Sequence, residues 1–123
     1  MLQRSFAPRG YLALYSDDAR LYGYHGVEPG RSGIRAFYEN FWASFPDSSV
    51  TLEHIIESGD EVVARFTLTA THQGALMGIP ATGLAVTLTG ITILRFRDGE
   101  VTERWSQADF FGLMQQISPG GAT

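Results

Sequence analysis

The spacing of apolar residues changes once along this chain of 123 residues and divides it into a helical part and a sheet part. Apolar side chains first recur at the helical period, at Ile34, Phe37, Tyr38, Phe41, Trp42 and Phe45. Ser32 is a suitable N-cap for this helix, and Pro46 ends it. After Pro46 apolar and polar residues alternate, which is the period of a strand. One helix followed by successive strands predicts an α+β fold, with one curved sheet wrapped around one main helix.

The sequence predicts five strands, a short one before the main helix and four after it. The predicted strands cover residues 20–25, 50–57, 62–73, 85–97 and 101–109, the first of them short and rich in aromatic residues. Gly59-Asp60 and Asp98-Gly99 are hairpin turns, and Gly90 predicts a bend or bulge inside a strand. A short helix is expected around residues 11–15 and a closing helix over 110–117. The chain is then a single domain, 1–123, with a core from 11 to 117 and a loose tail over 118–123.

Strand parity predicts which side chains point towards the core. One list of inward residues is Val50, Leu52, His54 and Ile56; a second is Val62, Ala64, Phe66, Leu68, Ala70 and His72; a third is Val101, Trp105, Gln107 and Asp109. The opposite face of the second strand is polar, with Arg65, Thr67, Thr69 and Thr71. The rings of Phe41, Phe66 and Trp105 are expected either to fill the core or to line an apolar pocket for a small molecule.

Composition excludes several classes of function. The net charge is −4 and basic residues form no cluster, which argues against nucleic acid as a partner. Cysteine is absent, so disulfides, thiolate nucleophiles and zinc–thiolate sites are excluded, and the remaining His and acidic residues lack the spacing of a metal site. No apolar run is long enough to span a membrane, and the N-terminus does not resemble a signal peptide. The expectation is a cytoplasmic protein.

Two residues are the leading candidates for catalysis, and each has a structural alternative. His72 follows a run of inward apolar residues and would reach a pocket, or would be a hydrogen-bonded histidine at the edge of the core. Asp109 would place a carboxylate beside Trp105, where burial raises its pKa, or would cap the helix that follows. For His54 and His25 a structural role is favoured, with pocket lining as the alternative.

Several segments, in this order and spacing, resemble the SnoaL-like polyketide cyclase (ester cyclase) family over residues 20–117. The segments are Phe45-Pro46-Asp47, Glu57 to Arg65, Thr71-His72-Gln73-Gly74, Gly78 to Gly83, Arg95 to Gly99, and Trp105 and Asp109 with Gly112 to Gln116. The resemblance implies the fold of the nuclear-transport-factor-2 class, a cone formed by a curved mixed sheet and helices. It also implies a homodimer formed through the outer face of the sheet.

The resemblance further implies cofactor-independent acid–base chemistry, an intramolecular aldol ring closure on a small apolar carbonyl compound. The aspartate that matches Asp109 is the acid/base in characterised cyclases of the family, and a histidine near the position of His72 lines the pocket. Gln107 and His72 are candidate donors to the developing enolate. The chain departs from the family at its start, where Pro8 and Gly10 interrupt the long first helix that closes the cone.

Other functions remain open, because the same fold carries different chemistries. One alternative is a non-catalytic module for ligand binding or dimerisation. Another is a related isomerase or hydrolase that uses the same acid–base pair. Whether the chain is an enzyme is therefore left open by the sequence.

Overall fold

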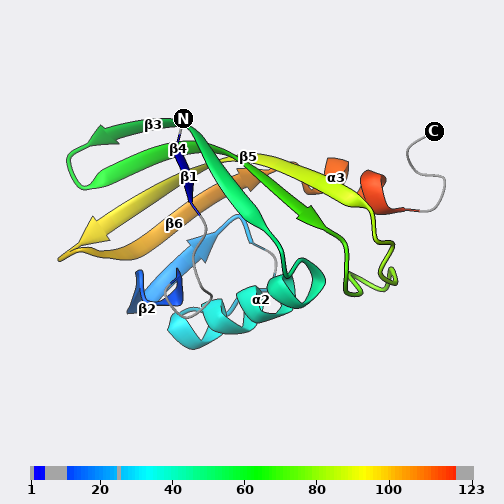
Figure 1. Ribbon diagram of the computed structural model, residues 1–123. Coiled ribbons are helices and arrows are strands. Elements are labelled where there is room, and N and C mark those ends of the chain that lie inside the picture. Colours follow the sequence, from blue (N-terminus) through cyan, green and yellow to red (C-terminus); the bar gives the residue numbers. More distant parts are fainter. Residues whose placement is uncertain (1, 5–10, 25, 119–123) are drawn as a thin grey trace.

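The computed structural model describes residues 2–4, 11–24 and 26–118, and in them a mixed sheet curves over one face of a helix (Figure 1). The six strands of this part of the chain are β1 (Leu2–Arg4), β2 (Tyr15–Tyr22), β3 (Ser49–Ser58), β4 (Glu61–Thr71), β5 (Ala85–Arg97) and β6 (Glu100–Ala108). Their order in the sheet is β1-β3-β4-β5-β6-β2. Only the pairing of β2 with β6 is parallel. The predicted α+β fold is confirmed, and the sheet does not close into a barrel.

Helix α2 (Arg31–Ser44) lies across the inner face of the sheet. Ile34 is fully buried in one core cluster, and Phe45, directly after the helix, is buried in a second. The predicted N-cap, Ser32, is wrong by two residues. The chain turns at Gly30, whose φ of +92° only glycine adopts easily, and its carbonyl accepts the amide of Ile34.

The strand predicted at residues 20–25 corresponds to β2, which starts earlier in the chain. β2 begins at Tyr15 rather than residue 20, and of the helix expected over 11–15 only residues 11–12 are helical, with a turn at 13–14. Parallel pairing with β6 explains the difference, because Tyr15 and Ala19 are buried beside β6, while Asp17 and Asp18 between them are exposed. His25, the Pro8–Gly10 interruption and positions 119–123 of the predicted tail lie outside the described residues.

A bulge in β3 reverses its predicted faces. Leu52 pairs with Phe66, but the next pair is His54 with Arg65, so Glu53 is an extra residue. After it the parity is inverted, and Ile55 rather than His54 or Ile56 faces inward. The prediction that His54 and Ile56 point towards the core is therefore wrong.

A second bulge, in β6, has a larger effect on the interior. Arg95 pairs with Glu103 and Phe96 with Val101, which leaves Thr102 without a partner in the ladder. Beyond it the inward residues are Arg104, Ser106 and Ala108. The predicted inward set of Trp105, Gln107 and Asp109 is wrong, because it assumed an unbroken alternation from Val101.

Strand β5 keeps its parity through Gly90, where a bend or bulge was predicted. Gly90 pairs in regular register with Phe66 and with Ala108. A Cβ at this position would lie 2.7 Å from Cζ of Phe66 and 2.7 Å from the carbonyl oxygen of Gln107. Glycine is required here because the Phe66 ring lies directly against the backbone of β5, not because the strand bends.

Helix α3 (Phe110–Ile117) is fixed to β5 by one side chain. The amide of Gln116 accepts a hydrogen bond from the backbone N–H of Thr87 and donates one to its carbonyl oxygen, both at 2.8 Å. Leu113 and Ile117 are buried in the core cluster that contains Phe45. The predicted closing helix is confirmed, and its docking holds Phe110 at one end of the interior.

Candidate ligand cavity

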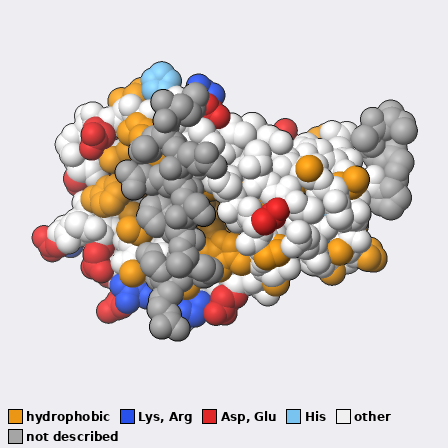
Figure 2. Space-filling model, in the orientation of Figure 1, with side chains coloured by type: hydrophobic (Ala, Val, Ile, Leu, Met, Phe, Trp, Pro, Cys, Tyr) orange, Lys and Arg blue, Asp and Glu red, His pale blue; other side chains and the backbone are white. Residues whose placement is uncertain are grey.

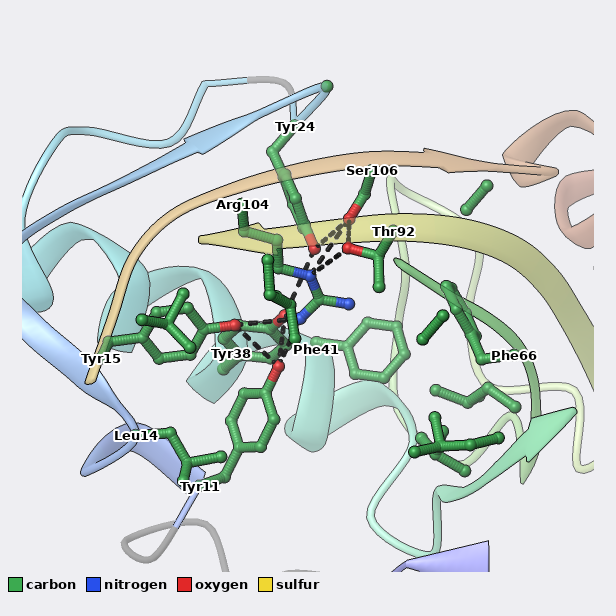
Figure 3. Close-up of a pocket in the computed structure, with 18 of the residues that line it drawn as sticks. Tyr11, Leu14, Tyr15, Tyr24, Tyr38, Phe41, Phe66, Thr92, Arg104 and Ser106 are labelled. Carbon is green, nitrogen blue, oxygen red and sulfur yellow. Dashed lines mark hydrogen bonds between the residues drawn. The ribbon is translucent and has the colours of Figure 1, made fainter. Parts of the chain in front are cut away.

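A cavity of about 390 Å³ lies between α2 and the inner face of the sheet. Aliphatic and aromatic side chains from α2 and from β3 to β6 form most of its wall, and hydrophobic side chains are visible in the middle of this face of the molecule (Figure 2). The volume is within the range of small-molecule sites. The cavity has a polar end, formed by hydroxyl groups around Arg104, and an apolar end near Phe41 and Phe66 (Figure 3).

Arg104 is the centre of the polar end. Its Nη1 donates to the hydroxyl oxygens of Tyr11, Tyr15 and Tyr38. Its Nε donates to Thr92 Oγ1 at 2.8 Å and to Ser106 Oγ at 3.1 Å. The bulge at Thr102 places Arg104 and Ser106 on the same inward face of β6, and Thr92 faces them from β5. Strand register therefore assembles the cluster from residues far apart in the sequence.

The hydroxyl groups of the cluster also bond to one another. Thr92 Oγ1 lies 2.8 Å from Ser106 Oγ, and Ser106 Oγ lies 3.1 Å from the hydroxyl of Tyr24. The hydroxyl of Tyr38 connects that of Tyr11, at 3.0 Å, with that of Tyr24, at 3.5 Å. The result is a continuous network of hydroxyl groups around one guanidinium group.

Arg104 carries the only formal charge among the described residues that line the cavity. Burial opposes the charged form, but the surrounding tyrosine oxygens hold the pKa of Arg104 above its usual value, so the group stays a cation. Burial raises the pKa of Tyr15 and of Tyr38, so both remain neutral phenols. The described lining contains no carboxylate to balance the guanidinium.

The remaining nitrogen of Arg104, Nη2, has no hydrogen bond to a described residue. It points away from the tyrosines, towards the part of the cavity near Phe41 and Phe66 (Figure 3). The site therefore offers a positively charged N–H donor at the boundary between its polar and apolar ends. Such a donor can stabilise negative charge that develops on a bound oxygen atom.

Asp109 lies beside the cavity rather than inside it. Its carboxylate is at the N-cap of α3 and accepts the backbone N–H of Gly112 at 2.9 Å, and the residue is exposed. Its neighbours in sequence, Ala108 and Phe110, both line the cavity. The carboxylate therefore caps the helix, which was the alternative role expected from the sequence. A catalytic role for Asp109 stays a prediction.

His72 is fully buried but belongs to the core rather than to the cavity wall. Its Nδ1 lies 3.0 Å from Thr82 Oγ1 and accepts the backbone N–H of Thr82, and its ring packs on Phe45. Asp109 and His72 are therefore not brought together across the cavity. The contacts of His72 instead hold the loop that connects β4 to β5.

The other predicted site residues are divided between the two faces of the sheet. Phe41 and Phe66 line the cavity. Trp105 lies on the outer face, where its ring stacks on Tyr22 at 5.2 Å and the guanidinium of Arg95 lies 5.1 Å from the ring centre. Gln107 and His54 are exposed, and neither lines the cavity.

The polar cluster that contains Arg104 was not predicted from the sequence. One signal for it is Thr92, a polar residue in phase with Leu88, Leu94 and Phe96. No glycine or proline marks the bulge at Thr102, so the alternation of β6 predicts the wrong face for Arg104 and Ser106.

Metal-binding clusters and membrane-spanning helices are both absent from the described residues. These residues contain no group of three or more His, Asp or Glu side chains placed to hold a metal ion. They also contain no helix that is long and apolar enough to cross a membrane.

A curved mixed sheet over one helix, with an apolar cavity between them and a few polar groups at one end, defines a small-molecule-binding α+β protein of the nuclear-transport-factor-2 type. A sequence model of the family described as SnoaL-like polyketide cyclase matches residues 9–117. The chain belongs to the SnoaL-like polyketide cyclase family.

Solved structures agree with this assignment. TsrD from Streptomyces laurentii is 31% identical, with a TM-score of 0.80 over 90% of this chain and 82% of that one. AclR from Streptomyces galilaeus, proposed to be a hydroxylase, is 31% identical with a TM-score of 0.79 over 89% and 69%. IdmH from Streptomyces antibioticus, proposed to be a polyketide cyclase, is 32% identical with a TM-score of 0.73 over 85% and 82%. No protein with a curated description matches the sequence.

Proposed function

We propose that this protein is a cyclase-type enzyme that closes a ring in a small apolar molecule carrying several carbonyl groups. The observation that carries the proposal is the half-buried Arg104, whose guanidinium lies at the edge of an apolar cavity of about 390 Å³. The family assignment supports small-molecule chemistry of the cyclase or hydroxylase type.

Intramolecular aldol closure is the reaction that this arrangement fits best. A base removes a proton from a carbon between two carbonyls, and the resulting enolate carbon attacks a third carbonyl carbon. One C–C bond forms, the π electrons of the attacked carbonyl move to its oxygen, and that oxygen gains a proton. Negative charge is carried first by the enolate oxygen and then by the alkoxide, and Arg104 Nη2 is the group that stabilises it.

Asp109 remains the proposed base, because it is the carboxylate between two residues of the cavity wall, Ala108 and Phe110. To act, it would exchange its hydrogen bond to Gly112 for contact with the substrate. His72 is not assigned a role in this proposal, since it is buried behind the wall against Phe45.

The test is the Asp109→Asn variant, assayed with a panel of linear tri- and tetraketones by loss of enol absorbance and by mass spectrometry of the cyclic product. Asparagine keeps the helix cap but is not a base, so we expect a loss of turnover of about 10²-fold or more with little change in stability. Asp98→Asn, at the exposed β5–β6 turn, is the matched control and should retain full turnover.

The result separates three possibilities. Unchanged turnover in Asp109→Asn would show that Asp109 is not the base. Binding of the ketones without conversion by the wild-type protein would favour the alternative of a non-catalytic binding module. Conversion to a different product would point to the isomerase or hydrolase alternative.

The outer face of the sheet supports a second part of the proposal, a homodimer. Five apolar side chains form a row across this face and are paired in register from strand to strand: Ile56, Val63, Ile93, Trp105 and Tyr22. Ile56 is 54% exposed and Ile93 is 36% exposed. The outer face is thus less polar than Arg65, Thr67, Thr69 and Thr71 suggested, and a second copy placed on it would bury the row.

Replacement of Ile93 by arginine is expected to produce a monomer, because it places a charge in the centre of the apolar row. Sedimentation velocity at about 50 μM should show a dimer for the wild type and a monomer for Ile93→Arg, with equal circular dichroism. Thr69→Arg, on the same face but outside the row, is the control and should remain dimeric. A monomeric wild-type protein, or a dimeric Ile93→Arg variant, would contradict this arrangement.

A further inference from the structure

The proton count of the polar cluster shows which of its groups can bind a ligand. Thr92 Oγ1 donates its single proton to the carbonyl oxygen of Trp105 at 3.0 Å. Ser106 must therefore donate to Thr92, and Tyr24 must donate to Ser106, since each hydroxyl has one proton. The same rule makes Tyr38 the donor to Tyr24.

The count continues to the far end of the network without conflict. Tyr11 donates to Tyr38, and Tyr15 donates to Tyr11. Each hydroxyl thus gives its proton to the next acceptor in one direction, in the order Tyr15, Tyr11, Tyr38, Tyr24, Ser106, Thr92 and the carbonyl of Trp105. No hydroxyl of this network keeps a proton for a ligand, so Arg104 Nη2 is its free donor.

The unbalanced charge of Arg104 favours an anion over a neutral ligand. A guanidinium in a site of low dielectric attracts an opposite charge more strongly than it would in water. The described lining supplies no carboxylate, and a raised pKa keeps Tyr15 and Tyr38 neutral. A ligand oxygen that becomes negative next to Nη2 would supply the missing charge.

The geometry also distinguishes between kinds of anion. A carboxylate usually binds arginine through two parallel N–H···O bonds from two nitrogens. Here Nη1 is occupied by three tyrosine oxygens and Nε by Thr92 and Ser106, so one nitrogen remains. A single oxygen, as in a phenolate or an enolate, matches one nitrogen better than a carboxylate does.

We propose that the cavity binds its ligand as a single-oxygen anion, a phenolate or the enolate of a 1,3-dicarbonyl, with the charged oxygen on Arg104 Nη2 and a flat apolar body between Phe41 and Phe66. This inference concerns the same cavity as the proposed ring closure and names its class of ligand. It rests on the position of Arg104 and would hold for a molecule that the protein binds without converting.

The test uses 7-hydroxycoumarin, a flat phenol whose neutral and ionised forms absorb at different wavelengths and which has no chain to cyclise. Its pH titration is followed with and without a saturating concentration of the protein. We expect the pKa of the bound phenol to fall by at least about one unit, which means that the anion binds at least about tenfold more tightly than the neutral form. The carboxylate of coumarin-3-carboxylic acid should bind at least about tenfold more weakly than this phenolate.

Two controls connect the result to Arg104. 7-Methoxycoumarin, which does not ionise, should bind with an affinity independent of pH. In the Arg104→Met variant the shift of the bound phenol should disappear, while 7-methoxycoumarin should bind within about threefold of wild type, since the apolar end is unchanged.

Several results would overturn the proposal: no binding of either form at about 1 mM, an unchanged or raised pKa of the bound phenol, or tighter binding of the carboxylate. A shift that persists in folded Arg104→Met would do the same. If Arg104→Met does not fold, the comparison of the three coumarins on the wild-type protein is sufficient. Failure of the ketone assay with a positive coumarin result would remove ring closure and leave anion binding in place.

Discussion

The Arg104→Met variant is expected to lose about 10²–10³-fold in turnover of a ketone substrate, with a change of less than about 1 kcal/mol in its free energy of unfolding. The loss of turnover follows from the position of Nη2, which is directed into the cavity and has no hydrogen bond to a described residue. Charge on the reacting oxygen would then be left in an apolar site without a donor. The measurement is kcat and KM of the variant beside its urea denaturation curve.

The small effect on stability has a separate reason. Arg104 is half-buried without a carboxylate partner among the described residues, so the folded state bears the cost of removing part of a cation from water. Methionine replaces the aliphatic part of the arginine side chain and removes that cost. The hydroxyls that accept from Arg104 keep their bonds to one another, for example Tyr11 to Tyr38 and Ser106 to Thr92.

Arg104→Lys is the informative companion variant. An ammonium group keeps the charge but cannot donate in the fixed planar directions that reach both the three tyrosines and the ligand. We expect its turnover to lie between those of the wild type and Arg104→Met. Full turnover in Arg104→Met would remove Arg104 from the chemistry, and a loss of several kcal/mol would show that its main role is structural.

The Gly23→Ala variant is expected to lose about 2–4 kcal/mol of stability and to disrupt the polar cluster. Gly23 has φ of +87°, and a Cβ there would lie 2.1 Å from the carbonyl oxygen of Ser106. The positive φ alone costs alanine about 1 kcal/mol, and the backbone clash adds to it because β2 must move away from β6. Tyr24, the next residue, would then lose its position beside Ser106.

Gly26→Ala is the matched control for this prediction. Gly26 also has a positive φ, +72°, but a Cβ there would meet nothing within 4 Å. It should lose only the backbone contribution of about 1 kcal/mol. Equal midpoints of urea denaturation for the two variants would show that the close approach of Gly23 to β6 is not what limits stability.

The elements of this fold were largely predictable because each has a strong local pattern. The helical repeat from Ile34 to Phe45 predicted α2 within two residues at its start and one at its end, and the Asp98-Gly99 turn joins β5 and β6 as predicted. Asp98 and Gly99 have φ of +52° and +80°, and an aspartate followed by a glycine is the sequence signal of such a turn. Regular strands of ten or more residues are the easiest to recognise, and β4 and β5 confirm this.

The interior was less predictable than the elements, because it depends on strand pairing over long distances. One extra residue in β6 exchanged Trp105 for Arg104 on the inner face, and no local feature of the sequence indicates that residue. The contacts of β2 with β6 join residues about 80 positions apart, so the strand could be extended only once its partner was known. The candidate site depends on both, which is why Phe41 and Phe66 were found and Arg104 was not.

The bulge at Thr102 also determines which chemistry β6 presents to the cavity. If β6 kept all its residues in a regular alternation from Val101, Glu103, Trp105 and Gln107 would face inward, while Arg104 and Ser106 would face outward. A cationic interior would become an acidic and aromatic one, and the outer face would lose the indole of its apolar row. Removal of Thr102 itself would leave Arg104 inward, because only the extra residue is lost. In proteins built on this sheet, the presence of a single bulge can therefore change the residues of both faces with no change in the order of the strands.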